Sequence, residues 1–396
     1  MPWGMSNGSH RVYSKGIATG RPPASSMASN TGRGSSRVTS TLGKREPWIV
    51  SESTSTVTAR CWRERPFCLT GNVACNAGTG YHPNRESTSS ITKNRCRSCQ
   101  RSTGRSEELP MQQPTWVRSW GSAGSGPGQL FGPVDLSLDD SGNVYVSDTF
   151  NHRIQKFDSA GNAILQWGRQ GSGPGEFYGP TGIVVDAQGH VWVAAAGNHR
   201  VQKFDADGKF LSTWGSLGRD PGCFANPYGI CVDAHGKLYV SDLNNHRIQK
   251  FGADEKFVLQ WHGSGTRQSA FSLPHGLLIS CEKEILVVDR ENARIVVFDL
   301  SGEHLSTWGG ASPEEGGLGD PRGIAMDSIG NIHVSDFAAN HISVFTPEGQ
   351  FLHTWGKPGA GRGEFASPAG LCGDDHGSMF VVDLRNHRVQ QFRVAE

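Results

Sequence analysis

The 396 residues could form one large domain or two ordinary ones, and the chain is long enough to bury a sizeable core. Its net charge of +1 conceals two unlike parts: residues 1–110 hold 16 Lys and Arg against 6 Glu, whereas residues 111–396 hold 22 Lys and Arg against 31 Asp and Glu. No apolar run suits a membrane span or the hydrophobic part of a secretory signal, so we expect neither.

Residues 1–110 are predicted to be a disordered tail. They are rich in Ser, Thr, Arg, Gly and Asn and poor in large aliphatic residues, so they cannot bury enough apolar surface to offset chain entropy. An Arg- and Ser-rich, acid-poor start also fits an organelle transit peptide, and Met111 stands where a natural initiator would be expected. Only Cys96 and Cys99 have metal-ligand spacing, without a matching second pair, which favours chance cysteines over a zinc site.

The rest of the chain repeats itself every 47 residues. Tryptophan recurs at this interval, at Trp120, Trp167, Trp214, Trp261, Trp308 and Trp355. Proline does the same, at Pro133, Pro180, Pro227, Pro274, Pro321 and Pro368. Phenylalanine repeats identically from Phe157 to Phe392. Three residue types that keep one interval indicate a repeat architecture.

One repeat, residues 180–227, contains four expected strands. Short apolar or alternating runs at 182–186, 191–194, 201–204 and 210–214 are separated by turn residues such as Gly and Asp. Four antiparallel strands in about 47 residues are typical of one blade of a β-propeller.

The two ends of the repeats predict how the ring closes. The sequence ends after the third strand of the sixth unit, whereas residues 116–121 have the pattern of a fourth strand and precede the first unit. Pairing the two would hide both sheet edges. We therefore predict an all-β fold, a six-bladed propeller over residues 115–396 whose N-terminal strand completes the last blade.

Residues 145–157 and 239–251 both read Tyr-Val-Ser-Asp-x-x-Asn-His-Arg-Ile-Gln-Lys-Phe, and residues 334–345 keep a degraded form. This repeat resembles the NHL family. The resemblance implies a six-bladed propeller, and it implies several functions, because NHL propellers occur in tripartite-motif ubiquitin ligases, RNA-binding translational repressors, bacterial sensors and peptidyl-hydroxyglycine lyases.

The Asn-His-Arg triplets could suggest catalysis, but their repetition favours a structural role. They begin at Asn151, Asn198, Asn245 and Asn386. An Asp precedes the Arg by five residues in four blades, as Asp148/Arg153, Asp242/Arg247, Asp289/Arg294 and Asp383/Arg388. A feature that serves every blade alike cannot build a single active site, so we expect it to form the loop and an ion pair.

A binding site is instead expected where the blades differ. The residues that follow the repeated prolines should surround the central mouth: Val134, Thr181, Tyr228, His275, Arg322 and Ala369. The loops between second and third strands share that face and contribute Phe150, Asn244, Arg290, Phe337 and Arg385. Aromatic and Arg residues are typical of interaction hot spots, so we predict partner binding through Tyr228, His275, Arg322, Asn244, Arg290, Arg385, Phe150 and Phe337. Ordinary solvated loop residues remain the alternative.

The segment around His275 and residues 288–295 also resembles a blade of the peptidyl-hydroxyglycine lyases, in which the histidine after proline binds zinc. That family repeats this histidine on alternate blades, but here the matching positions are Thr181 and Ala369, and Asn244 stands where the lyases have a tyrosine. One His cannot hold catalytic zinc. We therefore predict no enzyme, no metal and no cofactor.

The predicted function is a non-enzymatic scaffold that binds a protein or peptide on the loop-rich face, as a cytoplasmic, monomeric propeller without a membrane partner. An organelle is the alternative location if the tail is a transit peptide. A role in the ubiquitin pathway would need a partner chain, because the sequence shows no RING or B-box pattern. Binding of single-stranded RNA is the alternative function; the acidic repeats oppose it, although Arg290, Arg322 and Arg385 could form a local basic patch.

Overall fold

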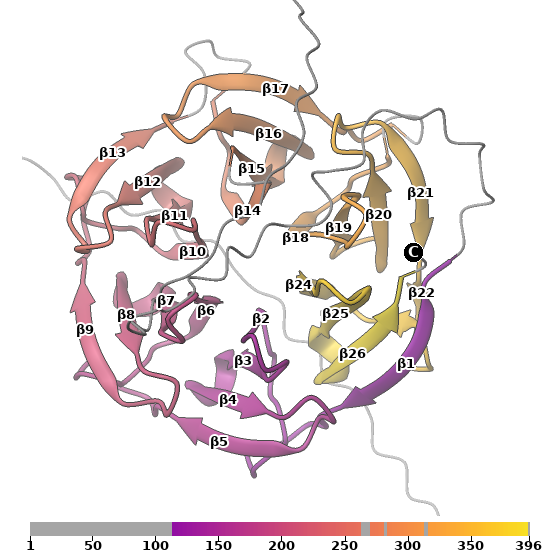
Figure 1. Ribbon diagram of the computed structural model, residues 1–396, viewed down its shortest axis with the longest axis horizontal. Coiled ribbons are helices and arrows are strands. Elements are labelled where there is room, and N and C mark those ends of the chain that lie inside the picture. Colours follow the sequence, from indigo (N-terminus) through magenta and orange to yellow (C-terminus); the bar gives the residue numbers. More distant parts are fainter. Residues whose placement is uncertain (1–112, 263–269, 281–282, 313–315, 395–396) are drawn as a thin grey trace, which may run out of the picture. The chain divides into compact units, whose positions relative to one another are not determined.

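The computed structural model describes residues 113–262, 270–280, 283–312 and 316–394. The predicted tail, with Cys96 and Cys99, lies outside the described residues. Within them, six four-stranded antiparallel sheets surround a central axis, with one sheet for each 47-residue repeat (Figure 1). The predicted six-bladed propeller is confirmed.

Each blade contributes its first strand to the central channel and its fourth strand to the rim of the ring (Figure 1). Blade 1 contains β2 (Leu136–Leu138), β3 (Val144–Asp148), β4 (Arg153–Phe157) and β5 (Ala163–Trp167). Blade 2 contains β6 (Pro180–Val185), β7 (Val191–Ala195), β8 (Arg200–Phe204) and β9 (Phe210–Trp214). Blade 3 contains β10 (Pro227–Val232), β11 (Leu238–Asp242), β12 (Arg247–Phe251) and β13 (Phe257–Trp261).

The second half of the ring repeats this order. Blade 4 contains β14 (Pro274–Ser280), β15 (Glu284–Asp289), β16 (Arg294–Asp299) and β17 (His304–Trp308). Blade 5 contains β18 (Pro321–Met326), β19 (Ile332–Asp336), β20 (His341–Phe345) and β21 (Phe351–Trp355). Blade 6 contains β24 (Pro368–Gly373), β25 (Ser378–Asp383), β26 (Arg388–Arg393) and the N-terminal β1 (Thr115–Trp120), and a short parallel pair, β22 (Lys357–Pro358) and β23 (Glu364–Phe365), precedes it.

The closure of the ring follows the prediction from the chain ends. β1 pairs antiparallel with β26, from Thr115 opposite Arg393 to Trp120 opposite Val389, so the sixth sheet has the order β1-β26-β25-β24. This pairing covers the edges of both strands, which would otherwise be free to template aggregation.

The repeated aromatic residues join each blade to the next. The Trp that ends each fourth strand packs on the Phe at or next to the end of the third strand of the following blade, with ring centroids 4.7 to 6.2 Å apart in all six pairs. The six Phe side chains are at most 1% exposed. The interval of 47 residues is therefore fixed by the packing between blades, where the hydrophobic clusters also lie.

The Asn-His-Arg triplets have a structural role. In four blades the Arg Nε lies 2.7 to 2.8 Å from the Asp carboxylate that precedes it by five residues. Short 3-10 turns precede the triplet His: η2 (Thr149–Asn151), η3 (Ala196–Asn198), η4 (Leu243–Asn245) and η7 (Leu384–Asn386), while blade 4 has η5 (Arg290–Asn292). The His then accepts a backbone hydrogen bond from the next blade, as in Gly179 N–H to His152 Nδ1 at 3.1 Å. The triplet thus joins neighbouring blades.

Candidate functional site

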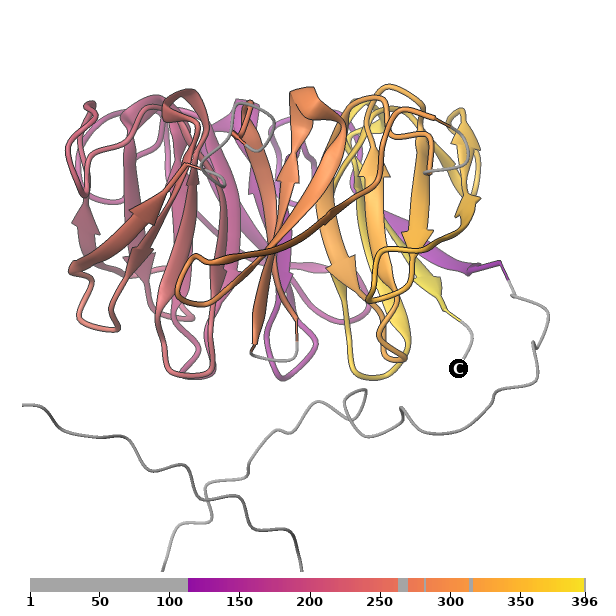
Figure 2. The ribbon, with the colours of Figure 1, turned by 90° about the horizontal axis from the view of Figure 1, so that it is seen from above.

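The ring presents two different faces, seen edge-on in Figure 2. We call the loop-rich face the one that carries the starts of the first strands and the turns η2, η3, η4, η5 and η7. The turn face is opposite, and it carries tight turns such as the one in which Gly189 N–H donates to Asp186 O.

An ionic and aromatic group on the loop-rich face, here called the arginine cluster, joins blades 4, 5 and 6. It consists of Arg290, Asp320, Arg322, Phe337 and Arg385. Arg290 Nε and Arg322 Nε lie 2.5 and 3.0 Å from Asp320 Oδ1, and the guanidinium carbons of Arg322 and Arg385 lie 4.2 and 5.8 Å from the Phe337 ring centroid. Partial burial would raise the pKa of Asp320, but hydrogen bonds and charge from both arginines together lower it. The cluster therefore holds one ionised carboxylate and three guanidinium groups.

Tyr228 and His275 close the centre of the ring beside this cluster. Their ring centroids are 4.2 Å apart, and His275 is only 1% exposed. His275 Nδ1 donates to the Leu273 carbonyl at 2.9 Å, which leaves Nε2 as an acceptor 3.4 Å from Arg322 Nη1. Burial, together with the Arg322 and Arg290 charges, lowers the pKa of His275 to about 3, so its imidazole is neutral at pH 7.

The structure brings only part of the predicted binding set together. Tyr228, His275, Arg322, Arg290, Phe337 and Arg385 form one continuous group through the contacts above. Phe150 is exposed elsewhere and packs on Phe131 at 5.8 Å. Asn244 lines a separate groove with Arg219 and His262.

The residues after the prolines are less accessible than a binding surface on the central mouth would require. Val134, Thr181 and Ala369 are buried, and Tyr228 and Arg322 are half-buried. The reason is geometric: these residues lie at or just before the start of the first strands, which surround the narrow centre of the ring. Val134, Tyr228, Arg322 and Ala369 line, together with Asp135, a small space of about 20 Å³, here called the neck.

Beyond the neck the channel widens into a cavity of about 340 Å³, which we call the channel cavity. It reaches the turn face, where Asp327, Ser328, Asp374 and Asp375 line it. Its walls are apolar side chains from the first strands of the blades, including Ile183, Ile230, Leu277, Ile324 and Leu371. The channel cavity therefore has an apolar interior and an acidic outer rim.

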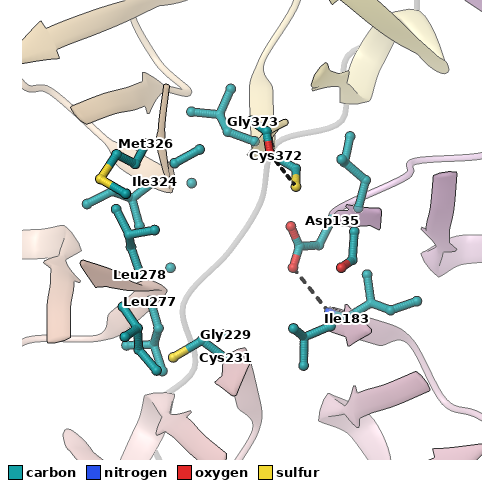
Figure 3. A pocket seen from close by; sticks show the side chains of 18 of the residues that line it. Asp135, Ile183, Gly229, Cys231, Leu277, Leu278, Ile324, Met326, Cys372 and Gly373 are labelled. Carbon is teal, nitrogen blue, oxygen red and sulfur yellow. Dashed lines mark hydrogen bonds between the residues drawn. The ribbon is translucent and has the colours of Figure 1, made fainter. Parts of the chain in front are cut away.

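Asp135 is an ionisable residue at the inner end of the channel cavity. It lines both the neck and the channel cavity, and its side chain points into the cavity (Figure 3). Its Oδ2 accepts a hydrogen bond of 3.2 Å from Ile183 N–H, and no Lys, Arg or His among the described residues forms an ion pair with it. Burial raises the pKa of Asp135 to about 7, because its backbone hydrogen bonds only partly offset the loss of water. Such a group is a candidate functional residue.

The sequence contained a signal for Asp135 that our sequence analysis did not use. The same position of the other blades is always glycine: Gly182, Gly229, Gly276, Gly323 and Gly370. These glycines are required by close contacts between blades, since a Cβ at Gly229 would collide with the carbonyl oxygen of His275. The Asp135 side chain is accommodated because it lies against Gly370, where a Cβ would collide with Asp135 Oδ1.

The thiols that face the same cavity do not offer a nucleophile. Burial, with a contribution from the charge of Asp135, raises the pKa of Cys372 to about 12, and burial also raises the pKa of Cys231. Both thiols are therefore protonated at neutral pH. Among the residues that the structure describes, no group of three His, Cys, Asp or Glu side chains is placed to hold a metal ion.

Comparison with known proteins supports the repeat assignment. The NHL repeat model matches residues 224–251, and the model of the SMP-30/gluconolactonase/LRE-like region matches residues 135–225. The chain is an NHL-type propeller. None of the curated proteins matches this propeller.

Three solved structures of enzymes resemble the NHL-type propeller in fold. A streptogramin B lyase is 16% identical with a TM-score of 0.51, over 72% of this chain and 88% of the lyase. The virginiamycin B lyase of Staphylococcus aureus is 15% identical with a TM-score of 0.51, over 70% of this chain and 99% of that chain. A gluconolactonase from Xanthomonas campestris is also 15% identical with a TM-score of 0.51, over 72% of this chain and 96% of that chain.

These findings contradict the prediction that the chain is not an enzyme. The prediction considered only the zinc-ligand set of the peptidyl-hydroxyglycine lyases, which is incomplete here because Thr181 and Ala369 stand where those enzymes have histidines. The match to the SMP-30/gluconolactonase/LRE-like region and the fold of the lyase and gluconolactonase structures point to other enzyme-like propellers, although the low identities establish the fold alone. In the described part of the chain, no helix is long and apolar enough to cross a membrane.

Proposed function

We propose that this NHL-type propeller binds an acidic peptide segment of a partner protein on its loop-rich face, at the arginine cluster. The observation that carries the proposal is a pair of guanidinium groups on one carboxylate, next to an aromatic ring that a third guanidinium group also contacts. This local positive charge lies on a propeller whose residues 111–396 carry 22 basic and 31 acidic side chains. An anionic ligand would therefore be attracted to the cluster in preference to the rest of the surface.

The three arginines differ in how they are held. Asp320 fixes Arg322 through Nε at 3.0 Å and Nη2 at 2.9 Å, and Arg322 in turn lies over Phe337. Arg385 is exposed, and no carboxylate in the described ranges lies within ion-pair distance of it. Arg385 thus supplies a guanidinium with free donors for a ligand carboxylate, next to an ordered cation and an aromatic surface.

The proposal is tested with a fluorescein-labelled peptide of alternating Glu and Phe, followed by anisotropy. Arg385→Ala should weaken binding by about 1 to 3 kcal/mol, the range of an interface hot spot. Lys209→Ala is the matched control, because Lys209 is exposed in a tight turn on the turn face. Equal affinity of wild type and Arg385→Ala would overturn the proposal, and tighter binding of a single-stranded oligonucleotide than of the peptide would replace it with RNA recognition.

A second candidate function is chemistry on a small molecule in the channel cavity. The specific observation in its favour is Asp135, since a carboxyl group with a pKa of about 7 can exchange a proton near neutral pH. The match to the SMP-30/gluconolactonase/LRE-like region begins at this residue and runs to residue 225. Hydrolysis of a panel of lactones, compared between wild type and Asp135→Asn, tests it: turnover that is equal in both proteins would exclude Asp135 as the proton-transfer group.

A further inference from the structure

The channel cavity combines an apolar wall with charge of one sign. Its lining includes four acidic residues, Asp135, Asp327, Asp374 and Asp375, and contains no Lys, Arg or His among the described residues. Low-dielectric walls concentrate the field of such charges. The channel cavity is therefore an attractive environment for a cation and a poor one for an anion.

The acidic residues at the rim and at the inner end have different roles. Asp327 accepts hydrogen bonds from Asn331 N–H and, at 3.0 Å, from the imidazole of His333, so its carboxylate is already used by the tight turn of its blade. Asp374 likewise accepts from Ser378 N–H at 2.7 Å. The Asp135 carboxylate accepts from Ile183 N–H at 3.2 Å and interacts with the Leu136 N–H, although a carboxylate can accept about four hydrogen bonds. Its remaining acceptor capacity faces the channel cavity.

The neck determines how far a ligand could enter from the turn face. About 20 Å³ is close to the space of a single water molecule, and Tyr228 and Arg322 line it. The guanidinium of Arg322 stands beyond Asp135, where it would repel a second cation. A cationic group that enters from the turn face would thus stop beside Asp135, with the rest of the ligand against the apolar wall.

We infer that the channel cavity binds a small organic amine, whose ammonium group pairs with Asp135 and whose apolar body packs against Ile183, Leu278 and Ile324. A volume of about 340 Å³ lies at the lower end of the range of small-molecule pockets. An ammonium group supplies both hydrogen bonds and a positive charge to the buried Asp135 carboxylate, whereas a neutral ligand supplies no charge. This inference is independent of peptide binding on the loop-rich face and does not require that the channel cavity catalyse a reaction.

Protonation gives the inference a second observable consequence. The titratable groups that face Asp135 from neighbouring strands, the Tyr228 phenol and the Cys372 thiol, have raised pKa values and are neutral at pH 7. Asp135 is then the group that titrates near neutrality. Pairing with an ammonium ion favours its charged form, so amine binding at pH 7 should release a proton from Asp135.

The test is calorimetric titration of the full chain with 2-phenylethylamine and its neutral analogue 2-phenylethanol. We expect the amine to bind at least about tenfold more tightly, a difference of about 1.4 kcal/mol. We also expect an enthalpy that depends on the ionisation enthalpy of the buffer, which reports the released proton. Asp135→Asn should abolish the preference for the amine and the proton release, whereas Asp140→Asn, an exposed position in the same blade, should keep both.

The outcomes separate this inference from peptide binding. Arg385→Ala should bind the amine as wild type does, because Arg385 lies on the loop-rich face. Equal affinity for amine and alcohol, amine binding unchanged in Asp135→Asn, or no binding of 2-phenylethylamine at millimolar concentration would each overturn the inference. Thermal unfolding of Asp135→Asn serves as the check that a lost preference does not reflect a lost fold.

Discussion

Replacement of Asp135 by Asn should stabilise the protein above neutral pH. The ordinary pKa of 3.8 applies to the unfolded chain, and the folded protein holds Asp135 at about 7. The folded state therefore binds more protons between these values, so stability falls as the pH rises through this window and stays lower above it. A difference of one in pKa is worth about 1.36 kcal/mol, so the full effect is about 4 kcal/mol. Because water in the channel cavity reaches part of the carboxyl, we expect about 2 to 4 kcal/mol.

Urea denaturation at pH 8 and pH 5 measures this effect. Asn keeps the shape of Asp and can still accept the hydrogen bond from Ile183 N–H. The gain should be present in full at pH 8 and should fall to less than half at pH 5, where the folded protein has Asp135 protonated. Asp140→Asn, at an exposed position, provides the control and should show no such dependence. A gain of equal size at both pH values, or a loss of stability at pH 8, would refute the reasoning about Asp135.

Three further predictions concern the ring. Removal of residues 115–121 should expose the edge of β26. Size-exclusion chromatography should then detect aggregates, or thermal denaturation should show a lower Tm. A truncated protein that is as stable and monomeric as the parent would contradict the closure of the ring by β1. Asp242→Ala leaves the guanidinium of Arg247, whose side chain is 2% exposed, without its carboxylate, so it should cost about 3 to 5 kcal/mol in urea denaturation while peptide affinity stays unchanged. Tyr228→Ala should let water reach His275 and raise the pKa of its imidazole from about 3 towards 6.5, which NMR titration would detect. An imidazole that stays neutral at pH 5 would show that other groups exclude water from it.

The fold could be predicted because the same packing contact joins every pair of neighbouring blades. The contact between Trp167 and Phe204 recurs around the ring, so the spacing of two residue types carries the geometry of the interface between blades. Closure was predictable for a related reason: one strand was missing at Phe392 and one was in excess at Trp120, and an exposed sheet edge is unfavourable.

The site was less predictable, since exposure depends on the radius at which a residue lies in the ring. Tyr228 and Arg322 were chosen because these positions differ between blades; Arg322 belongs to the arginine cluster and Tyr228 lies beside it. Their partial burial results from the narrow channel that the six blades form together. The sequence of a single repeat carries no information on the width of that channel. The pairing of Arg290 with Asp320 of the following blade was likewise absent from the sequence analysis, because it joins two repeats through loops that differ from blade to blade.

The position of Asp135 suggests a general way to find functional residues in repeat proteins. Glycine at this position in five blades satisfies the close contact between first strands, so the Asp in blade 1 is unnecessary for the fold. Its raised pKa implies that its charged form lowers stability above neutral pH, which the urea experiment measures. A residue that departs from the repeat, and that destabilises the fold by doing so, is best explained by a ligand or a reaction that uses it. The arginine cluster departs from the repeat at several positions, but Asp320 already neutralises part of its charge. Asp135 has no such partner among the described residues, and the channel cavity is therefore the part of this protein where a bound small molecule would contribute most.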